Sequence, residues 1–88
     1  MWTVKIKRRM ERSISSLPDD VQSLYVMLKA DLTSDGPEQK SWKNYSKLGA
    51  NRYHCHLNYH YVACWTVLDN EEMILEVYYV GSRENAPY

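Results

Sequence analysis

The chain has 88 residues, enough for one domain over residues 1–88. A chain of this length buries only about 60–65% of the surface that it exposes when unfolded, so its core is thin. Its 11 basic and 11 acidic residues cancel, so bulk charge gives no argument for nucleic-acid binding. No segment approaches the roughly 20 apolar residues of a membrane helix and no signal peptide is visible, so we expect a cytoplasmic protein outside the membrane.

Charged residues are segregated along the chain although their sum vanishes. Nine of the basic residues gather near the start and in the middle of the chain, at Lys5, Lys7, Arg8, Arg9, Arg12, Lys40, Lys43, Lys47 and Arg52. The acidic residues gather at Asp19, Asp20, Asp31, Asp35 and between Asp69 and Glu76. The basic groups are either solvated helix and loop faces or a local cluster that meets phosphates.

The first third of the chain predicts a strand followed by two helices. Residues 2–7 alternate between apolar and polar side chains, which is typical of a half-buried strand. Met10, Ile14 and Leu17 recur at helical spacing and predict a short helix. Pro18, followed by two aspartates, marks the start of a second helix, which we expect to end near Ser34 before Asp-Gly-Pro.

The rest of the chain predicts a loop and three strands. Residues 38–51 are polar and predict a long loop, and strands are expected over 52–57, 61–68 and 73–80 with short connections between them. The order β-α-α-β-β-β predicts an α+β fold, an antiparallel four-stranded sheet with a helical hairpin packed on one face. The opposite face is expected to be open. Cys55 and Cys64 lie in apolar stretches and are interpreted as buried free thiols, with a cross-strand disulfide as the alternative.

Two histidines on one predicted strand are the main candidates for chemistry. Alternation in the strand sends Tyr53, Cys55 and Leu57 toward the helices and both His54 and His56 to the other face. Neighbours on one strand face lie about 6.6 Å apart, which suits two imidazoles flanking one phosphate. Cleavage of RNA by its own 2′-hydroxyl needs a base and an acid, and histidine serves as either near neutral pH.

Other interpretations of these histidines stay open. The pair is also compatible with a solvated polar strand face. A zinc site that adds His60 is a further alternative, but no third ligand has convincing spacing, so we expect no metal and no other cofactor.

The end of the chain supplies a candidate cation and a candidate aromatic group. Gly81 and Arg83 follow the last predicted strand and place a guanidinium at the end of the sheet, where it can stabilise a transition-state charge. The alternative is a surface arginine paired with Glu84. Tyr88 can stack on a base or donate a proton, or it covers the core.

Four runs of this chain resemble a known family and together with the element order cover almost all of it. They are Asn44-Tyr45-Ser46-Lys47-Leu48, Tyr53-His54-Cys55-His56-Leu57, Tyr61-Val62-Ala63-Cys64-Trp65 and Tyr79-Val80-Gly81-Ser82-Arg83-Glu84-Asn85-Ala86-Pro87-Tyr88. The chain resembles the RelE/ParE superfamily of toxins from type II toxin–antitoxin systems, in its RelE-like branch. The resemblance implies a toxin held inactive by a partner antitoxin, and, as in RelE proper, an endoribonuclease that cuts mRNA on the ribosome.

The resemblance also implies a set of site residues. It assigns catalysis to His54, His56, Arg83 and Tyr88, where RelE proper has lysines at the histidine positions. Contact with the RNA backbone falls to Lys43, Lys47, Arg52 and His60. The family places an arginine near the start of the third strand, where this chain has His60, Tyr61 and Val62. The implied enzyme is a metal-independent ribonuclease.

Two other functions are compatible with the same resemblance. A ParE-like toxin inhibits DNA gyrase through a protein interface, but ParE lacks the basic catalytic set that the histidine pair and Arg83 supply here. An inactive relative binds only its antitoxin, and the neutral net charge fits it best.

Overall fold

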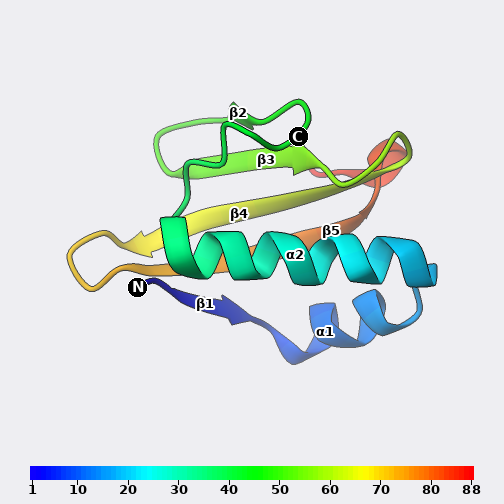
Figure 1. The fold of residues 1–88 in the computed structure, drawn as a ribbon, viewed down its shortest axis with the longest axis horizontal. Coiled ribbons are helices and arrows are strands. Elements are labelled where there is room, and N and C mark those ends of the chain that lie inside the picture. The colour runs from blue at the N-terminus through cyan, green and yellow to red at the C-terminus, as the bar shows by residue number, and fades with distance from the viewer.

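The computed structural model describes all 88 residues and contains one five-stranded sheet with two helices (Figure 1). In chain order the elements are strand β1 (Thr3–Ile6), helices α1 (Arg8–Ser15) and α2 (Asp19–Asp35), strands β2 (Ser46–Lys47), β3 (Arg52–His56), β4 (Tyr61–Asp69) and β5 (Ile74–Ser82), and a short 3-10 turn, η1 (Arg83–Asn85). The strands lie in the order β1-β5-β4-β3-β2.

The predicted α+β class is confirmed, but the prediction of a four-stranded antiparallel sheet is wrong. The sheet has five strands and is mixed, because β1 pairs with β5 in parallel. A parallel neighbour needs a crossover connection, and α1 and α2 begin that connection. The fifth strand, β2, lies within the predicted loop and pairs with β3 through only two residues, both exposed. A segment so short and polar carries no hydrophobic alternation, so its pairing left no trace in the sequence pattern.

Helix α2 follows the sequence signals closely. Pro18 precedes its first turn, which carries Asp19 and Asp20 at the positive end of the helix dipole. The helix ends at Gly36, whose φ of 90° is in the region that favours glycine, and a Cβ there would lie 2.6 Å from the Trp2 ring. Glycine is therefore required at the end of α2, both by its backbone conformation and by the lack of space for a Cβ beside Trp2.

The core lies between the helices and one face of the sheet. Leu28 and Leu32 of α2 are fully buried, and Trp65 and Leu75 of the sheet meet them in one cluster to which α1 adds Ile14. Burial of apolar surface at about 25 cal/mol per Å² is the main stabilising term of such a core. Both cysteines are buried and free, as predicted.

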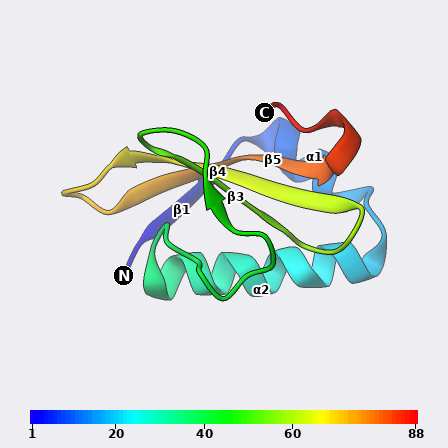
Figure 2. The ribbon, with the colours of Figure 1, turned by 90° about the horizontal axis from the view of Figure 1, so that it is seen from above.

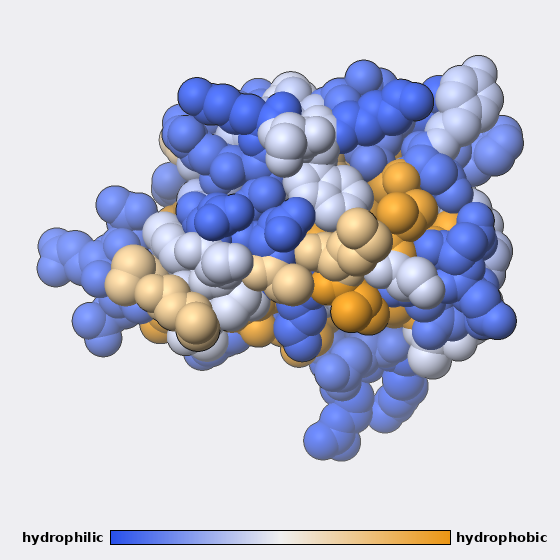
Figure 3. All heavy atoms as spheres, in the orientation of Figure 1, coloured by the Kyte–Doolittle hydropathy of each residue, from blue (hydrophilic) through white to orange (hydrophobic).

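The two sides of the molecule differ in what covers them. Figure 2 shows α2 on one side of the sheet and the C-terminal segment on the other. On the α2 side, apolar atoms lie among hydrophilic ones (Figure 3), and Val26 and Met27 of this helix are largely exposed. No helix has the length and apolar character required to cross a membrane. The side opposite α2 carries the predicted site.

Candidate functional site

His54 and His56 share the sheet face opposite the core, as the alternation predicted. Cys55, between them, belongs to the core, whereas the two imidazole rings lie 5.8 Å apart outside it. The expectation of an open face is wrong at His54, which is only 9% exposed. The ring of Tyr88 covers it with centroids 4.7 Å apart, because the chain folds back over β3 after η1. His56 stays partly exposed beside it.

Two polar side chains from the segment before β3 hold the imidazoles. Ser46 Oγ lies 2.9 Å from Nδ1 of His54, its partner residue in the β2–β3 pairing. Asn44 Nδ2 lies 3.4 Å from Nδ1 of His56. Both contacts are at Nδ1 of the ring. No sequence pattern assigns a role to Asn44 or Ser46, because only the β2–β3 pairing brings this segment to the histidines.

The environment favours the neutral form of both rings. Burial lowers the pKa of His54, the charge of His56 lowers it further, and a hydrogen bond with the backbone of Ser46 acts in the opposite direction. Burial also lowers the pKa of His56, followed by the positive charges of Arg83 and Lys43. A neutral imidazole can accept a proton, so either ring can act as a base near neutral pH.

Arg83 holds its guanidinium in the site without a carboxylate partner. It stacks over the ring of Tyr59 at 4.9 Å, and the structure's only ion pair joins Lys40 and Glu38, so Arg83 does not pair with Glu84. Its backbone N–H donates to the carbonyl of His60 at 2.8 Å, which joins the turn after β5 to the start of β4. Arg83 therefore keeps a free positive charge near His56.

Tyr79, which was not among the predicted site residues, supports the end of β5. The Tyr79 hydroxyl donates to the carbonyl of Ser82 at 2.8 Å, directly before Arg83. The Tyr79 ring lies over Gly81, where a Cβ would meet the hydroxyl oxygen at 2.7 Å. A tyrosine and a glycine two residues apart on one strand face are the signal that predicts this contact.

The ring of Tyr88 lies beside that of His54. Burial raises the pKa of its hydroxyl, Cys64 adds to this, and the charge of Arg83 acts in the opposite direction. The phenol is therefore a neutral hydrogen-bond donor beside His54.

The four predicted backbone-binding residues lie in different places. Lys43 is near the site, since its carbonyl accepts a hydrogen bond of 2.7 Å from the N–H of His56. Arg52 shares the strand face of the histidines, and its positive charge acts to lower the pKa of Tyr78. Lys47 does not join them: its ammonium group lies 5.7 Å from the Tyr53 ring, on the core side of the sheet.

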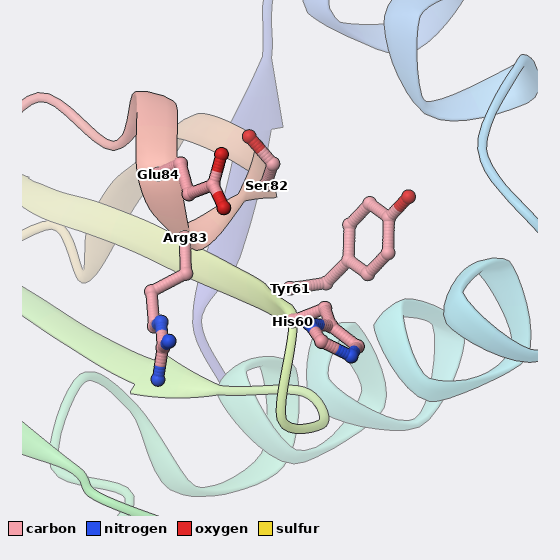
Figure 4. A pocket seen from close by; sticks show the side chains of 5 residues that line it. All are labelled: His60, Tyr61, Ser82, Arg83 and Glu84. Atoms are coloured by element: carbon pink, nitrogen blue, oxygen red, sulfur yellow. The ribbon is translucent and has the colours of Figure 1, made fainter.

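His60 lines a hollow beside Arg83. This hollow of about 260 Å³ is bordered by His60, Tyr61, Ser82, Arg83 and Glu84 (Figure 4). No group of three or more His, Cys, Asp or Glu side chains is arranged to hold a metal ion. The zinc alternative therefore has no ligand set in this structure.

The fold is that of the RelE-like toxin structures. No family model and no curated protein matches the chain, but solved structures do over nearly its whole length. RelE in an archaeal RelE–RelB complex from Pyrococcus horikoshii has a TM-score of 0.75 at 15% identity, covering 97% of this chain and 98% of that one.

Other solved toxin structures share this fold. The isolated Escherichia coli RelE toxin has a TM-score of 0.74 at 16% identity, covering 99% of this chain and 89% of its own. The YoeB–YefM complex from Staphylococcus aureus has a TM-score of 0.68 at 12% identity, with 91% and 94% covered. A metal-bound toxin from Helicobacter pylori has a TM-score of 0.66 at 16% identity, with 96% and 97% covered. At these identities the likeness establishes the fold.

Proposed function

We propose that this chain is the toxin of a type II toxin–antitoxin pair and that it cleaves mRNA. One observation carries the proposal: two imidazoles with ring centroids 5.8 Å apart lie near an arginine that has no carboxylate partner. They do so on a fold shared with RelE and YoeB toxins.

The proposed reaction uses the 2′-hydroxyl of the RNA as nucleophile. One imidazole accepts the 2′-hydroxyl proton while the 2′ oxygen forms a bond to phosphorus, and the bond from phosphorus to the 5′ oxygen breaks. The other histidine, protonated in the complex, or the Tyr88 hydroxyl returns a proton to that oxygen. The products are a 2′,3′-cyclic phosphate and a 5′-hydroxyl. Either His54 or His56 can be the base.

Arg83 stabilises the charge that develops on the phosphate oxygens. A preorganised donor at such a position contributes about 10²–10³-fold to the rate. Lys43 and Arg52 hold the RNA backbone on either side of the histidines, and His60 contacts it beyond Arg83. Lys47, although predicted for this role, lies on the core side of the sheet, so it is excluded from the proposed binding path.

This mechanism requires no metal ion, because imidazoles and a guanidinium supply the acid, base and charge stabilisation. We therefore propose a metal-independent ribonuclease, although two similar structures are metal-bound toxins from Helicobacter pylori. Cleavage that survives an excess of chelator supports this proposal, and cleavage restored only by added metal contradicts it.

The proposed partner is an antitoxin protein. Two neighbours were solved as complexes, RelE with RelB and YoeB with YefM. A bound antitoxin would mask the basic groups around the histidines until it is removed. The proposed substrate is mRNA engaged by ribosomes in the cytoplasm.

Induction in growing bacteria tests the proposal. Primer extension on a reporter mRNA should show new 5′ ends and growth should stop. His54→Ala, His56→Ala and Arg83→Ala should each lower cleavage by at least about 10²-fold. Lys47→Ala is the matched control and should cleave normally. Growth arrest with intact mRNA and a DNA-damage response would instead indicate gyrase inhibition, and no arrest would indicate an inactive relative.

A further inference from the structure

The segment that precedes β3 pairs with it at two points and sets its own polar side chains beside the imidazoles. The carbonyl of Lys43 accepts a hydrogen bond of 2.7 Å from the N–H of His56, and Ser46 faces His54 in the β2–β3 register. Asn44, between these two points, has a φ of 53°, a left-handed conformation that asparagine adopts more readily than most residues. The backbone therefore fixes where Asn44 and Ser46 stand relative to the two rings.

The contact between Ser46 and His54 has a direction. Ser46 Oγ lies 2.9 Å from Nδ1 of His54, and a hydroxyl at that distance can either donate or accept. The hydrogen bond with the backbone of Ser46 acts to raise the pKa of His54, which means that it favours a protonated ring nitrogen on this side. The ring therefore donates toward Ser46 from Nδ1. In the neutral ring the lone pair is then at Nε2.

Asn44 does not constrain His56 in the same way. Its Nδ2 lies 3.4 Å from Nδ1 of His56, at the long end of hydrogen-bond distances. An amide carries a donor and an acceptor side by side, so its rotation matches either protonation state of the ring. His56 is also partly exposed, whereas His54 is buried. Only His54 is therefore held to one tautomer.

The other groups around His54 do not hold its proton. Cys64 is its partner residue on β4, and burial raises the pKa of that thiol to about 11. The ring of Tyr88 lies 4.7 Å away, and burial raises the pKa of its hydroxyl, so both groups are neutral near neutral pH. On β3 itself, Arg52 and protonated His56 offer no acceptor. Ser46 is therefore the acceptor that the surroundings provide at Nδ1.

We propose that Ser46 is a positioning residue whose hydroxyl holds the proton of His54 at Nδ1, so that Nε2 of His54 is the base for the 2′-hydroxyl proton. The hydrogen bond made by one ring nitrogen sets which nitrogen carries the proton, and here that bond is made by β2. The inference rests on the proposed function and narrows it, because it assigns the base to His54 and leaves the acid to His56 or Tyr88.

NMR of the ring nitrogens tests the tautomer without any cleavage. Full-length protein with isotope-labelled histidine is measured at mildly alkaline pH, where both rings are neutral because folding lowers their pKa below 6.5. The signals of His54 are identified by their loss in His54→Gln. In the parent, Nδ1 of His54 should carry the proton and Nε2 should not. A proton at Nε2 in the parent would overturn the inference.

Three variants assign this tautomer to the hydroxyl. Ser46→Ala should move the proton of His54 toward Nε2, whereas Ser46→Thr keeps a hydroxyl and should keep the tautomer. Ser34→Ala removes an exposed hydroxyl from α2, on the other side of the sheet (Figure 2), and is the matched control. An unchanged tautomer in Ser46→Ala would overturn the role of Ser46.

Cleavage kinetics separate this inference from the proposed function. Ser46→Ala should lower kcat by about fivefold or more and leave KM unchanged, because the hydroxyl acts on His54 and not on the RNA, and Ser46→Thr should recover most of the rate. An equal kcat in the parent and Ser46→Ala overturns the inference and leaves the nuclease intact. A tautomer that depends on Ser46 in a protein that cleaves no RNA supports the role of Ser46 in holding the ring and contradicts the nuclease.

Discussion

Gly81→Ala should destabilise the protein because of one side chain, Tyr79. A Cβ at position 81 would lie 2.7 Å from the hydroxyl oxygen of Tyr79 and 2.9 Å from Cζ, which is closer than real contacts allow. The backbone of Gly81 is not in the left-handed region, so alanine is not excluded by φ. The Tyr79 ring must move, and its 2.8 Å hydrogen bond to the Ser82 carbonyl breaks.

The magnitude follows from three contributions. Overpacking costs about 1–3 kcal/mol, and loss of the hydrogen bond about 1 kcal/mol. Alanine in place of glycine in a strand contributes about 0.5–1 kcal/mol in the opposite direction. A net loss of about 2 kcal/mol lowers the Tm of a domain of this size by about 8–16 °C.

A double-mutant cycle isolates the contact. Thermal and urea unfolding are measured for Gly81→Ala alone and in a Tyr79→Ala background. In that background no ring opposes the Cβ, so the same change should be neutral or stabilising. An equal loss in both backgrounds would refute the reasoning, since the cost would then not arise from Tyr79.

Three further predictions address the site and the core. Arg83→Gln should lower mRNA cleavage by about 10²–10³-fold and raise the pKa of His56 in an NMR titration. Lys47→Gln, the control, should change neither. An unchanged pKa of His56 in Arg83→Gln would contradict the position of Arg83 beside it. Folding lowers the pKa of His54 and His56 below their ordinary 6.5, so the unfolded chain binds more protons, and the free energy of unfolding should fall as the pH drops through 6.5 and below. Urea titrations at several pH values should show a weaker pH dependence for His54→Asn. An equal pH dependence in the variant would count against the lowered pKa of His54. Leu28→Ala removes a side chain that is 0% exposed and should cost about 3 kcal/mol or more by urea unfolding, and a loss below about 1 kcal/mol would mean that the core relaxes around it.

Local signals predicted the elements well because each acts over a few residues. Pro18 with the following aspartates placed the start of α2, and the glycine after it placed the end. Alternation placed β3, β4 and β5 within about two residues of their bounds. The direction of β1 depends on its pairing with the distant strand β5, which no local pattern encodes, and β2 is too short and polar to show a strand pattern.

The same division holds at the site. Strand parity alone predicted that His54 and His56 share the face away from the core. The same alternation would have removed Lys47 from the predicted RNA-binding residues if its pairing with the core residue Tyr53 had been known. The contact of Arg83 with Tyr59 joins residues that are far apart in the sequence, and the contact of Ser46 with His54 depends on the pairing of β2 with β3.

The amino-acid sequence by itself determined which segments are helices and strands, which strand faces are apolar, and that two imidazoles project from one side of β3. Only the tertiary structure decided that Tyr88 covers one of them, that Arg83 stands free of Glu84, and that the sheet is mixed. The physical reason is that period and propensity act between neighbours in the chain. Burial, the surroundings of a charge and strand order instead depend on which distant segments meet in space.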